Sequence, residues 1–340
     1  MPFTACSAPN TRIIFDFDSA VLGDPRLGYF RSLPRSTAPG FPYCMDKKPG
    51  KKDYLGYGDV YDLTGPKALE LRARVDYIIE QARSGVRLSH VFLDFLKDEL
   101  RPARKNDLVQ TRLISSSPMD YTIAFRMMFG AFMNAVMQHH VKCGMAPGVC
   151  TYTEWEHVWS ALTVKGDKVI AGDFKAFDSS LQPPVLWAIL DFINEWYADS
   201  EENRLARRVL WCDLVHSRHI GGDGTKQVHV YQWNKSLPSG HPFTTIVNSM
   251  YSLTMLVAAV SRILGKNTSS FWEYCAAVTY GDDNVLNVSD SVAPLVTQVA
   301  LGQAMDAFAM HYTSDDKIAE LGSHSRMDCI TFLKRSFKKK

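Results

Sequence analysis

The stretch "CAAVTYGDDNVLNV", residues 275 to 288, constrains the fold of this chain more than any other feature. Ala276 to Tyr280 has the apolar character of a strand, and Asn284 to Val288 alternates polar and apolar residues at the period of a half-buried strand. Gly281 and two adjacent acids stand between them, and these residue types suit a tight turn. The sequence therefore predicts a β-hairpin with two carboxylates at its tip, although the same residues also occur in turns without any function.

Length and composition describe an ordinary globular chain. The 340 residues correspond to two average domains or to one large enzyme, and 46% apolar with 22% charged residues provides a sizeable core. The net charge of +2 argues against a protein that coats nucleic acid over its whole surface. It leaves room for a local basic channel.

The cysteines indicate reduced thiols in a cytosolic setting. There are seven, an odd number, and none form the short-spaced pairs of a disulfide framework. Cys212, His216 and His219 have a spacing suited to metal ligands but lack a clear fourth ligand. A zinc site there is an alternative to the simpler interpretation as surface polar residues.

No membrane segment is expected. The N-terminus has no charged-then-apolar signal pattern, and the most apolar stretch, Met250 to Val260, is short for a bilayer span and contains two hydroxyl residues. We expect a soluble protein whose membrane contacts are made through partners.

The apolar periodicity predicts a sheet packed on helices, which is an α+β fold. The first 60 residues are rich in turn formers and are expected to form an ordered loop region that buries Phe41, Tyr43, Tyr54 and Tyr57. The Met- and Phe-rich stretch near residues 120–140 is expected to be core. The expected helices cover residues 66–82, 120–140, 184–197 and 293–310, another long helix follows the loop "SLPSGHPF", and strands are expected at 168–178 and 329–333.

A third acid stands at the end of another strand. If the strand ending near Asp173 lies beside the hairpin, three carboxylates meet at one edge of the sheet. Two like charges ~4 Å apart repel by about 1 kcal/mol in water and by about 4 kcal/mol at an effective dielectric near 20. A cation would relieve this repulsion, and Mg²⁺ is the usual partner of carboxylates and phosphates. The pattern thus fits two-metal phosphoryl transfer, with acids that decorate separate loop ends as the alternative.

Phosphoryl transfer also needs positive charge near the phosphates. One segment supplies a basic run interleaved with apolar residues, which favours a structured basic loop over a solvated face: Lys97, Arg101, Arg104, Lys105 and Arg112. Lys317, in "TSDDKIAE", is either a surface lysine or a proton donor to a leaving pyrophosphate.

Seven blocks of the chain, in order, resemble the motifs of the RNA-dependent RNA polymerases of picornavirus-like positive-strand RNA viruses. They span residues 36 to 337 and resemble the dicistrovirus, iflavirus and marnavirus branch. In family order from G, F, A, B, C, D to E they are "STAPGFPY", "LKDELRPARKNDLVQTRLISSS", "GDFKAFDSS", "LPSGHPFTTIVNSM", "YGDD", "YTSDDK" and "TFLKRSF". His241-Pro242-Phe243 stands where many picornaviral enzymes carry small residues, and predicts a stiffer loop.

The resemblance implies a right-hand polymerase fold, in which a palm with an antiparallel, RRM-like sheet packs on helices beside mixed α/β fingers. Family members usually continue into a helical thumb, so the thumb is expected to be absent or truncated here. The implied parts are fingers at 1–165, with motif G near 36–43 and motif F near 97–116, palm with motif A at 166–200, a fingers or palm insertion at 201–234, palm with motifs B, C and D at 235–328, and motif E with the start of a truncated thumb at 329–340.

The resemblance also implies roles for single residues. Asp173 and Asp282 would bind two Mg²⁺ ions, for which Mn²⁺ can substitute, with Asp283 as a weaker ligand and Lys317 as the general acid. The remaining roles are ribose selection by Asp178, Ser239, Thr244 and Asn248, triphosphate binding by Lys97, Arg101, Lys105 and Arg112, and template or primer contacts by Ser36, Thr37, Gly240, Lys334 and Arg335.

The implied function is RNA-templated transfer of ribonucleoside monophosphates from triphosphates to an RNA 3′-OH, which replicates a viral positive-strand genome. Implied partners are template and primer RNA, ribonucleoside triphosphates, a protein primer and other viral replication proteins. Release from a polyprotein and action in the host cytoplasm, at membrane-associated replication complexes reached through partners, belong to the same expectation.

Two other functions stay open. A reverse transcriptase shares the palm acids but would typically carry an aromatic residue near position 178 and a bulkier residue than Gly281. A truncated, catalytically silent fragment would bind RNA in a salt-dependent manner without any effect of Mg²⁺.

Overall fold

The computed structural model describes residues 11–48, 50–100, 111–222, 227–316 and 320–338. The chain forms two compact units, which we name by their contents. The hairpin unit contains residues 135–181 and 245–340, and the basic unit contains residues up to 134, apart from the first seven, and 182–244. The sequence-based parts divide the chain at other residues, because helices such as α5 (Met119–Gln138) run through the contact-based boundaries without a break.

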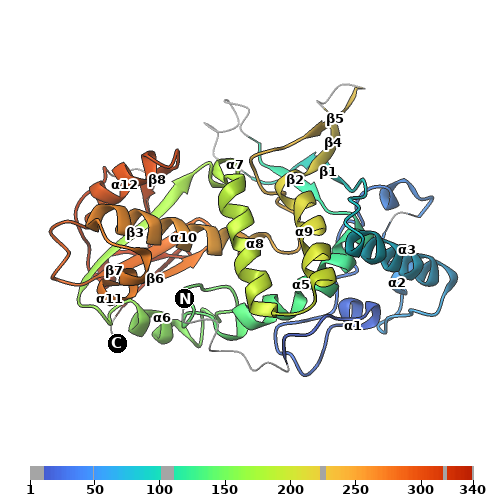
Figure 1. Ribbon diagram of the computed structural model, residues 1–340, viewed down its shortest axis with the longest axis horizontal. Helices are drawn as coiled ribbons and strands as arrows, with labels where there is room; N and C mark the ends of the chain where they lie inside the picture. The colour runs from blue at the N-terminus through green and yellow to red at the C-terminus, as the bar shows by residue number, and fades with distance from the viewer. Residues whose placement is uncertain (1–10, 49, 101–110, 223–226, 317–319, 339–340) are drawn as a thin grey trace. The chain divides into compact units, whose positions relative to one another are not determined.

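The hairpin unit is built on a four-stranded antiparallel sheet with the order β6-β7-β3-β8 (Figure 1). Its strands are β3 (Lys168–Lys175), β6 (Cys275–Tyr280), β7 (Asp283–Val288) and β8 (His311–Ser314). Tyr280 pairs with Asp283 across the turn. The predicted hairpin is therefore confirmed, with each strand one residue longer at its start.

Helices and short elements complete this unit. They are α6 (Trp155–Ala161), α7 (Phe177–Ser180), α10 (Thr244–Leu264), η4 (Thr268–Ser270), α11 (Phe271–Tyr274), α12 (Gln298–Asp306), η5 (Met327–Cys329), β9 (Thr331–Phe332) and β10 (Arg335–Ser336). Alternate residues of the sheet, including Val169, Ala171 and Val285, enter one apolar cluster together with Phe332 and Phe337. This face of the sheet forms part of the core of the unit.

Two predicted elements of this unit had wrong boundaries. The helix expected at 293–310 begins only at Gln298, because the Thr297 hydroxyl caps it by accepting from the Ala300 N–H at 3.1 Å, and the chain leaves the helix through Ala309 at φ 55°. The strand expected at 329–333 shortens to β9, because Leu333 and Lys334 both have positive φ and turn the chain into β10.

The basic unit contains a second four-stranded sheet, with the order β2-β1-β4-β5. Its strands are β1 (Val91–Leu96), β2 (Leu113–Ser116), β4 (Arg218–Gly222) and β5 (Val228–Gln232), and β1 runs parallel to β4 while the other pairs are antiparallel. Its helices are α1 (Phe17–Leu22), η3 (Tyr43–Met45), α2 (Lys52–Leu55), α3 (Pro66–Arg83), α8 (Pro183–Tyr197), α9 (Glu201–Val215) and most of α5. Strand β4 ends with Gly221 and Gly222.

Aromatic side chains form the core of the basic unit. Phe125 and Phe129 of α5 stack with ring centroids 4.0 Å apart, and both contact Phe243 and Trp211. This confirms that the Met- and Phe-rich stretch is core. In the loop region before α3, Tyr43 and Tyr54 are buried against each other as expected, whereas Tyr57 is 65% exposed, which corrects that part of the prediction.

Helix α10 is longer than the apolar stretch seen in the sequence. Among the described helices it is the one whose length and composition would suit a membrane span, with 21 residues. Of its most apolar window, 67% is buried inside the protein, as is typical of a core helix. The burial of α10 therefore indicates a core helix, even though its length would suit a membrane span.

Candidate active site

Asp173 lies at the C-terminal part of β3, next to the tip of the hairpin. Its neighbour Gly172 forms the last pair of the β3–β7 ladder with Asn284, so Asp173 and Asp283 occupy the next position along the two strands. Because opposite residues of neighbouring strands share a face, the two side chains are expected on the same face of the sheet. Asp173 is 2% exposed, and one of its carboxylate oxygens accepts from the Phe174 N–H at 2.6 Å.

The hairpin turn is held by a single residue of α10. Gly281 has φ 62°, which glycine adopts without strain, and its N–H donates to the Ser249 hydroxyl at 2.9 Å. The Thr279 hydroxyl donates to the Ser249 carbonyl at 2.9 Å. Ser249 thus fixes the turn from both its side chain and its backbone.

A second tie comes from Asn284, which directly follows the acids. Its amide donates to the Asp282 carbonyl at 3.0 Å, and its side-chain oxygen accepts from the Tyr312 hydroxyl of β8 at 2.9 Å. Gly172 permits this contact, since a Cβ there would stand 2.1 Å from the Tyr312 hydroxyl oxygen. The sequence interpretation missed Asn284, Tyr312 and Ser249, because each acts through a contact distant in sequence.

Asp178 lies on a short helix and not at the end of a strand as predicted. β3 ends at Lys175, Ala176 turns the chain at φ 53°, and α7 follows with Asp178 in its first turn. The Asn248 amide of α10 donates to Asp178 Oδ1 at 2.9 Å. Asn248 is 8% exposed, and its Oδ1 is buried with no hydrogen-bond partner among the described residues. A buried acceptor of this kind is costly unless a ligand satisfies it.

The basic segment is described at its two ends. The Lys97 N–H donates to the Arg112 carbonyl at 2.8 Å, which extends the β1–β2 pairing. Both side chains lie beside Glu99, whose carboxylate oxygen is 3.1 Å from Lys97 Nζ and 3.7 Å from an Arg112 nitrogen. Glu99 therefore draws the two cations together. The other cations expected to act on the triphosphate, Arg101 and Lys105, lie outside the described residues, as does Lys317.

Ser239 and Gly240 lie against the backbone of β2. The Ser239 hydroxyl accepts from the Ser115 N–H and donates to the Leu113 carbonyl, both at 3.2 Å. The Gly240 N–H donates to the Ser115 carbonyl at 3.0 Å, and a Cβ on Gly240 would stand 2.3 Å from that oxygen. The Thr244 hydroxyl is within reach of two carbonyls of its own loop, at 2.8 and 2.9 Å. In this structure these hydroxyls fix the loop.

The residues expected to touch template and primer lie in each unit at the surface. Ser36 and Thr37 are exposed, and the buried ammonium of Lys51 donates to the Thr37 hydroxyl at 2.7 Å. In the hairpin unit, Lys334 is exposed, and the Arg335 guanidinium stacks over Tyr152 at 4.5 Å.

The fold brings the acidic residues of the predicted metal site only partly together. Within the described part of the chain, no three acidic, His or Cys side chains are gathered closely enough to hold a metal ion as they stand. The ladder that ends with Gly172 and Asn284 nevertheless places Asp173 and Asp283 one residue beyond its last pair, with Asp282 next in the turn. Carboxylates are the hard oxygen ligands that Mg²⁺ prefers, so the donor set fits that ion.

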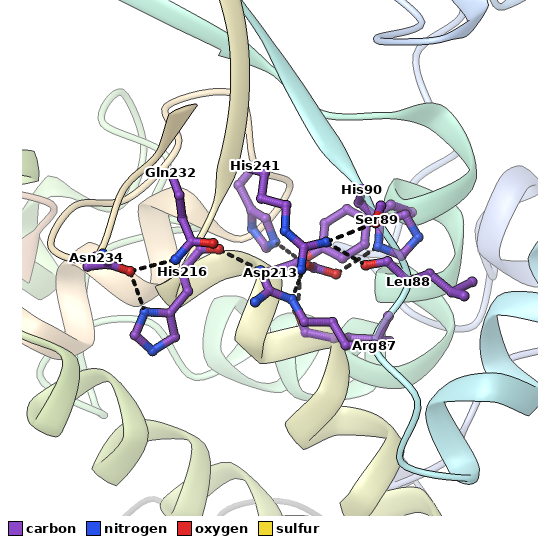
Figure 2. A network of polar contacts seen from close by, with 12 residues as sticks. Arg87, Leu88, Ser89, His90, Asp213, His216, Gln232, Asn234 and His241 are labelled. Carbon is purple, nitrogen blue, oxygen red and sulfur yellow. Dashed lines mark hydrogen bonds and ion pairs between the residues drawn. The ribbon is translucent and has the colours of Figure 1, made fainter. Parts of the chain in front are cut away.

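The zinc alternative does not gain support from the geometry. Both ring nitrogens of His219 are engaged, with Asp94 at 3.0 Å and the Ser217 hydroxyl at 2.7 Å. His216 instead contacts Asn234 at 3.1 Å (Figure 2). Within the described part of the chain, Cys212 and these two histidines do not form a group that could hold a metal ion.

An antiparallel sheet with acids near a strand end and at a hairpin tip is typical of right-hand polymerases, and a solved structure has the same fold. The chain is similar to the "Sicinivirus 3Dpol RNA dependent RNA polymerase", with a TM-score of 0.77 over 99% of this chain and 67% of that one, at 22% identity. The fold is therefore an α+β right-hand polymerase fold.

Residues 27–340 match the family model described as viral RNA-dependent RNA polymerase, and the chain belongs to that family. It is 35% identical to the replicase polyprotein of Drosophila C virus and 33% identical to that of cricket paralysis virus, each over 96% of this chain. The replicase polyprotein of acute bee paralysis virus is 32% identical over the same share. The chain spans 17–19% of the length of these three polyproteins. The resemblance to picornavirus-like polymerases is thereby confirmed.

Proposed function

We propose that this chain carries the catalytic palm of an RNA-directed RNA polymerase and transfers ribonucleoside monophosphates from triphosphates to an RNA 3′-OH. The observation that carries the proposal is the register of the sheet, which aligns Asp173 with Asp283 next to Asp282. Family membership favours this function over a reverse transcriptase and over a silent RNA-binding fragment.

The acids would bind two Mg²⁺ ions, for which Mn²⁺ can substitute. Asp173 and Asp282 are the proposed main ligands, and Asp283 is a weaker one. When bound, the ions supply the positive charge that stabilises the attacking and leaving oxygens of phosphoryl transfer. The chain holds the ligands in place through Ser249 at the turn and through the Asn284–Tyr312 contact behind it.

Lys97 and Arg112 would neutralise the triphosphate, together with Arg101 and Lys105. Positioning and charge stabilisation supply most of the catalysis of phosphoryl transfer. Glu99 supports this role, because it restrains two of these side chains. Lys317 would be the general acid that protonates the pyrophosphate leaving group.

The Asn248–Asp178 pair would select ribose. Asp178 fixes the orientation of the Asn248 amide, which leaves the buried Asn248 Oδ1 as an acceptor for a ribose hydroxyl. The 2′-OH both donates and accepts, so it distinguishes ribonucleotides from deoxynucleotides at such a site. Ser239 and Thr244 would contribute from the loop before α10.

The proposed partners and location follow from the relatives. Template and primer RNA would contact Ser36, Thr37, Gly240, Lys334 and Arg335. A protein primer and other viral replication proteins would assemble with the chain after its release from a polyprotein, in the host cytoplasm at membrane-associated complexes.

Primer extension on a self-priming RNA hairpin with Mg²⁺ tests the function, comparing each ribonucleotide with its 2′-deoxy form. Wild type is expected to extend with ribonucleotides, and Asn248→Ala to lose roughly tenfold or more of the preference, which corresponds to one hydrogen bond of about 1.4 kcal/mol. Asn194→Ala is the matched control, since Asn194 is also buried but accepts from Arg207 on α9. Equal use of both sugars by wild type would contradict the proposal.

A further inference from the structure

The segment 236–243, which we name the selection loop, is attached to the fold on two sides. On one side, Ser239 and Gly240 bond to the backbone of β2 at Ser115. On the other side, His241 and Phe243 enter the core of the basic unit, 4% and 2% exposed. The loop leads directly into α10, which carries Asn248.

Each ring nitrogen of His241 has a hydrogen-bond partner. The Phe243 N–H can only donate, so His241 Nδ1 accepts from it at 3.2 Å. The Tyr121 hydroxyl donates to the Leu210 carbonyl at 3.0 Å, so its oxygen accepts from His241 Nε2–H, also at 3.0 Å. The imidazole is therefore neutral, with its proton on Nε2, and it joins the loop to α5 and α9.

The surroundings of His241 favour this neutral form. Its ring meets Phe125 edge to face at 4.4 Å, and burial lowers the pKa of the imidazole to about 3. The ring of Tyr121, its hydrogen-bond partner, also lies 4.9 Å from the His90 ring, and His90 pairs with Asp213 (Figure 2).

We propose that His241 is a positioning residue of the polymerase: by latching the selection loop to Tyr121 it fixes the segment that leads into α10, which carries Asn248, and thereby sets the discrimination between ribonucleotides and 2′-deoxyribonucleotides. The inference rests on the proposed function, because it assigns a task to the loop that precedes the ribose-selecting residues. It goes further in naming the contact that keeps the loop in place.

Two substitutions at His241 separate its two hydrogen bonds. In His241→Asn the side-chain oxygen stands near the position of Nδ1, so the hydrogen bond from the Phe243 N–H is kept. The hydrogen bond to the Tyr121 hydroxyl is lost. The amide of His241→Gln reaches the position of Nε2 and keeps Tyr121. Tyr121→Phe removes the latch from the opposite side while keeping the ring.

The measurement is the ratio of kcat/KM for a ribonucleotide to that for its 2′-deoxy form, together with Tm. We expect about a tenfold fall in the ratio for His241→Asn and Tyr121→Phe, and recovery to within about threefold of wild type for His241→Gln. Tyr197→Phe is the matched control, because Tyr197 is an equally buried tyrosine whose hydroxyl accepts from the Phe132 N–H, away from the loop. It is expected to lower Tm without changing the ratio.

The proposal is contradicted if Tyr121→Phe and His241→Asn keep the wild-type ratio of kcat/KM values, or if Tyr197→Phe lowers that ratio equally. Failure of the proposed function is a different result, since wild type would then extend no primer. Hydrogen exchange decides in that case: the Gly240 and Phe243 amides are expected to exchange at least tenfold faster in Tyr121→Phe than in wild type. Unchanged exchange of these amides would reject the latch independently of activity.

Discussion

At the scale of single residues, the site depends on backbone conformations that few side chains tolerate. Gly281 has φ 62°, and the space where its Cβ would stand is open to 4 Å. The obstacle to any other residue is therefore conformational strain and not collision, so the cost of a substitution follows from the conformation alone.

Gly281→Ala is expected to lower the free energy of unfolding by about 1 kcal/mol, the cost of a left-handed conformation for a residue with a Cβ. Urea unfolding measures the difference. Gly58→Ala is the control, because Gly58 also has open space but no positive φ. Equal stability of the two variants would contradict the explanation.

Lys51 is a buried cation whose charge is expected to destabilise the fold. It is 6% exposed, it donates to the Thr37 hydroxyl, and burial, together with the charge of Arg126, lowers the pKa of its ammonium from 10.5 to about 8. Lys51→Met is expected to raise the free energy of unfolding at pH 7 by about 2 kcal/mol.

Lys51 should also make the free energy of unfolding of the wild-type protein depend on pH. Between pH 8 and 10.5 the unfolded chain keeps the proton that the folded chain releases, so wild type gains stability as pH rises through this window. The advantage of Lys51→Met should shrink from pH 7 to pH 9.5 in denaturant titrations. A constant difference would show that the cost does not come from the charge.

At the scale of elements, the hairpin is tied to the rest of its sheet through Asn284 and Tyr312. Tyr312→Phe leaves the buried Asn284 Oδ1 without its donor, which should cost about 1–3 kcal/mol. Thermal unfolding is the measurement. Tyr57→Phe is the control, because its hydroxyl bonds only at the surface and its loss should change little. A Tyr312→Phe variant as stable as this control would show that the tie is unimportant.

The selection loop should also make stability depend on pH. The folded pKa of His241, about 3, lies below its ordinary value of 6.5, so below pH 6.5 the unfolded chain binds a proton that the folded chain does not. The contribution of His241 to the free energy of unfolding therefore decreases as the pH falls from 6.5 towards 3, by up to about 1.4 kcal/mol per pH unit. Tyr121, the partner of His241, also contacts His90, which pairs with Asp213 (Figure 2), so the comparison must isolate His241.

Unfolding of wild type and His241→Gln at pH 7 and pH 5 provides that comparison. Glutamine does not titrate, so the variant should lose less stability than wild type on acidification. An identical loss in both proteins would mean that His241 is protonated in the fold or does not contribute.

At the scale of the whole molecule, the sequence pattern correctly predicted the elements that depend on residues close together in the chain. Strand alternation and a glycine turn were enough for the hairpin of β6 and β7, and helical spacing located α8 to within one residue. The start of α12 was missed because a single cap, Thr297, decides it. Asp178 was misplaced because Ala176 adopts a left-handed conformation that its residue type does not reveal.

The contacts that position the site could not be predicted in this way. Tyr312 reaches Asn284 from another strand, and His241 reaches Tyr121 and the Leu210 carbonyl from another part of the chain. Such contacts arise only when elements distant in sequence pack together. The motif resemblance predicts the residue types of the candidate site, and the fold shows which residues form hydrogen bonds around them.

The central claim is that Asp173 and Asp282 are ligands of the ions that drive nucleotide transfer. Single-nucleotide primer extension against Mg²⁺ concentration tests it in wild type, Asp173→Asn and Asp282→Asn. Asp290→Asn is the control, because Asp290 belongs to the same unit but is exposed and paired with Lys168. We predict Mg²⁺-dependent extension by wild type and the control within twofold of each other, and a loss on the order of 10³-fold in both other variants. Extension by Asp173→Asn and Asp282→Asn at a rate near that of wild type, or none by wild type, would contradict the account.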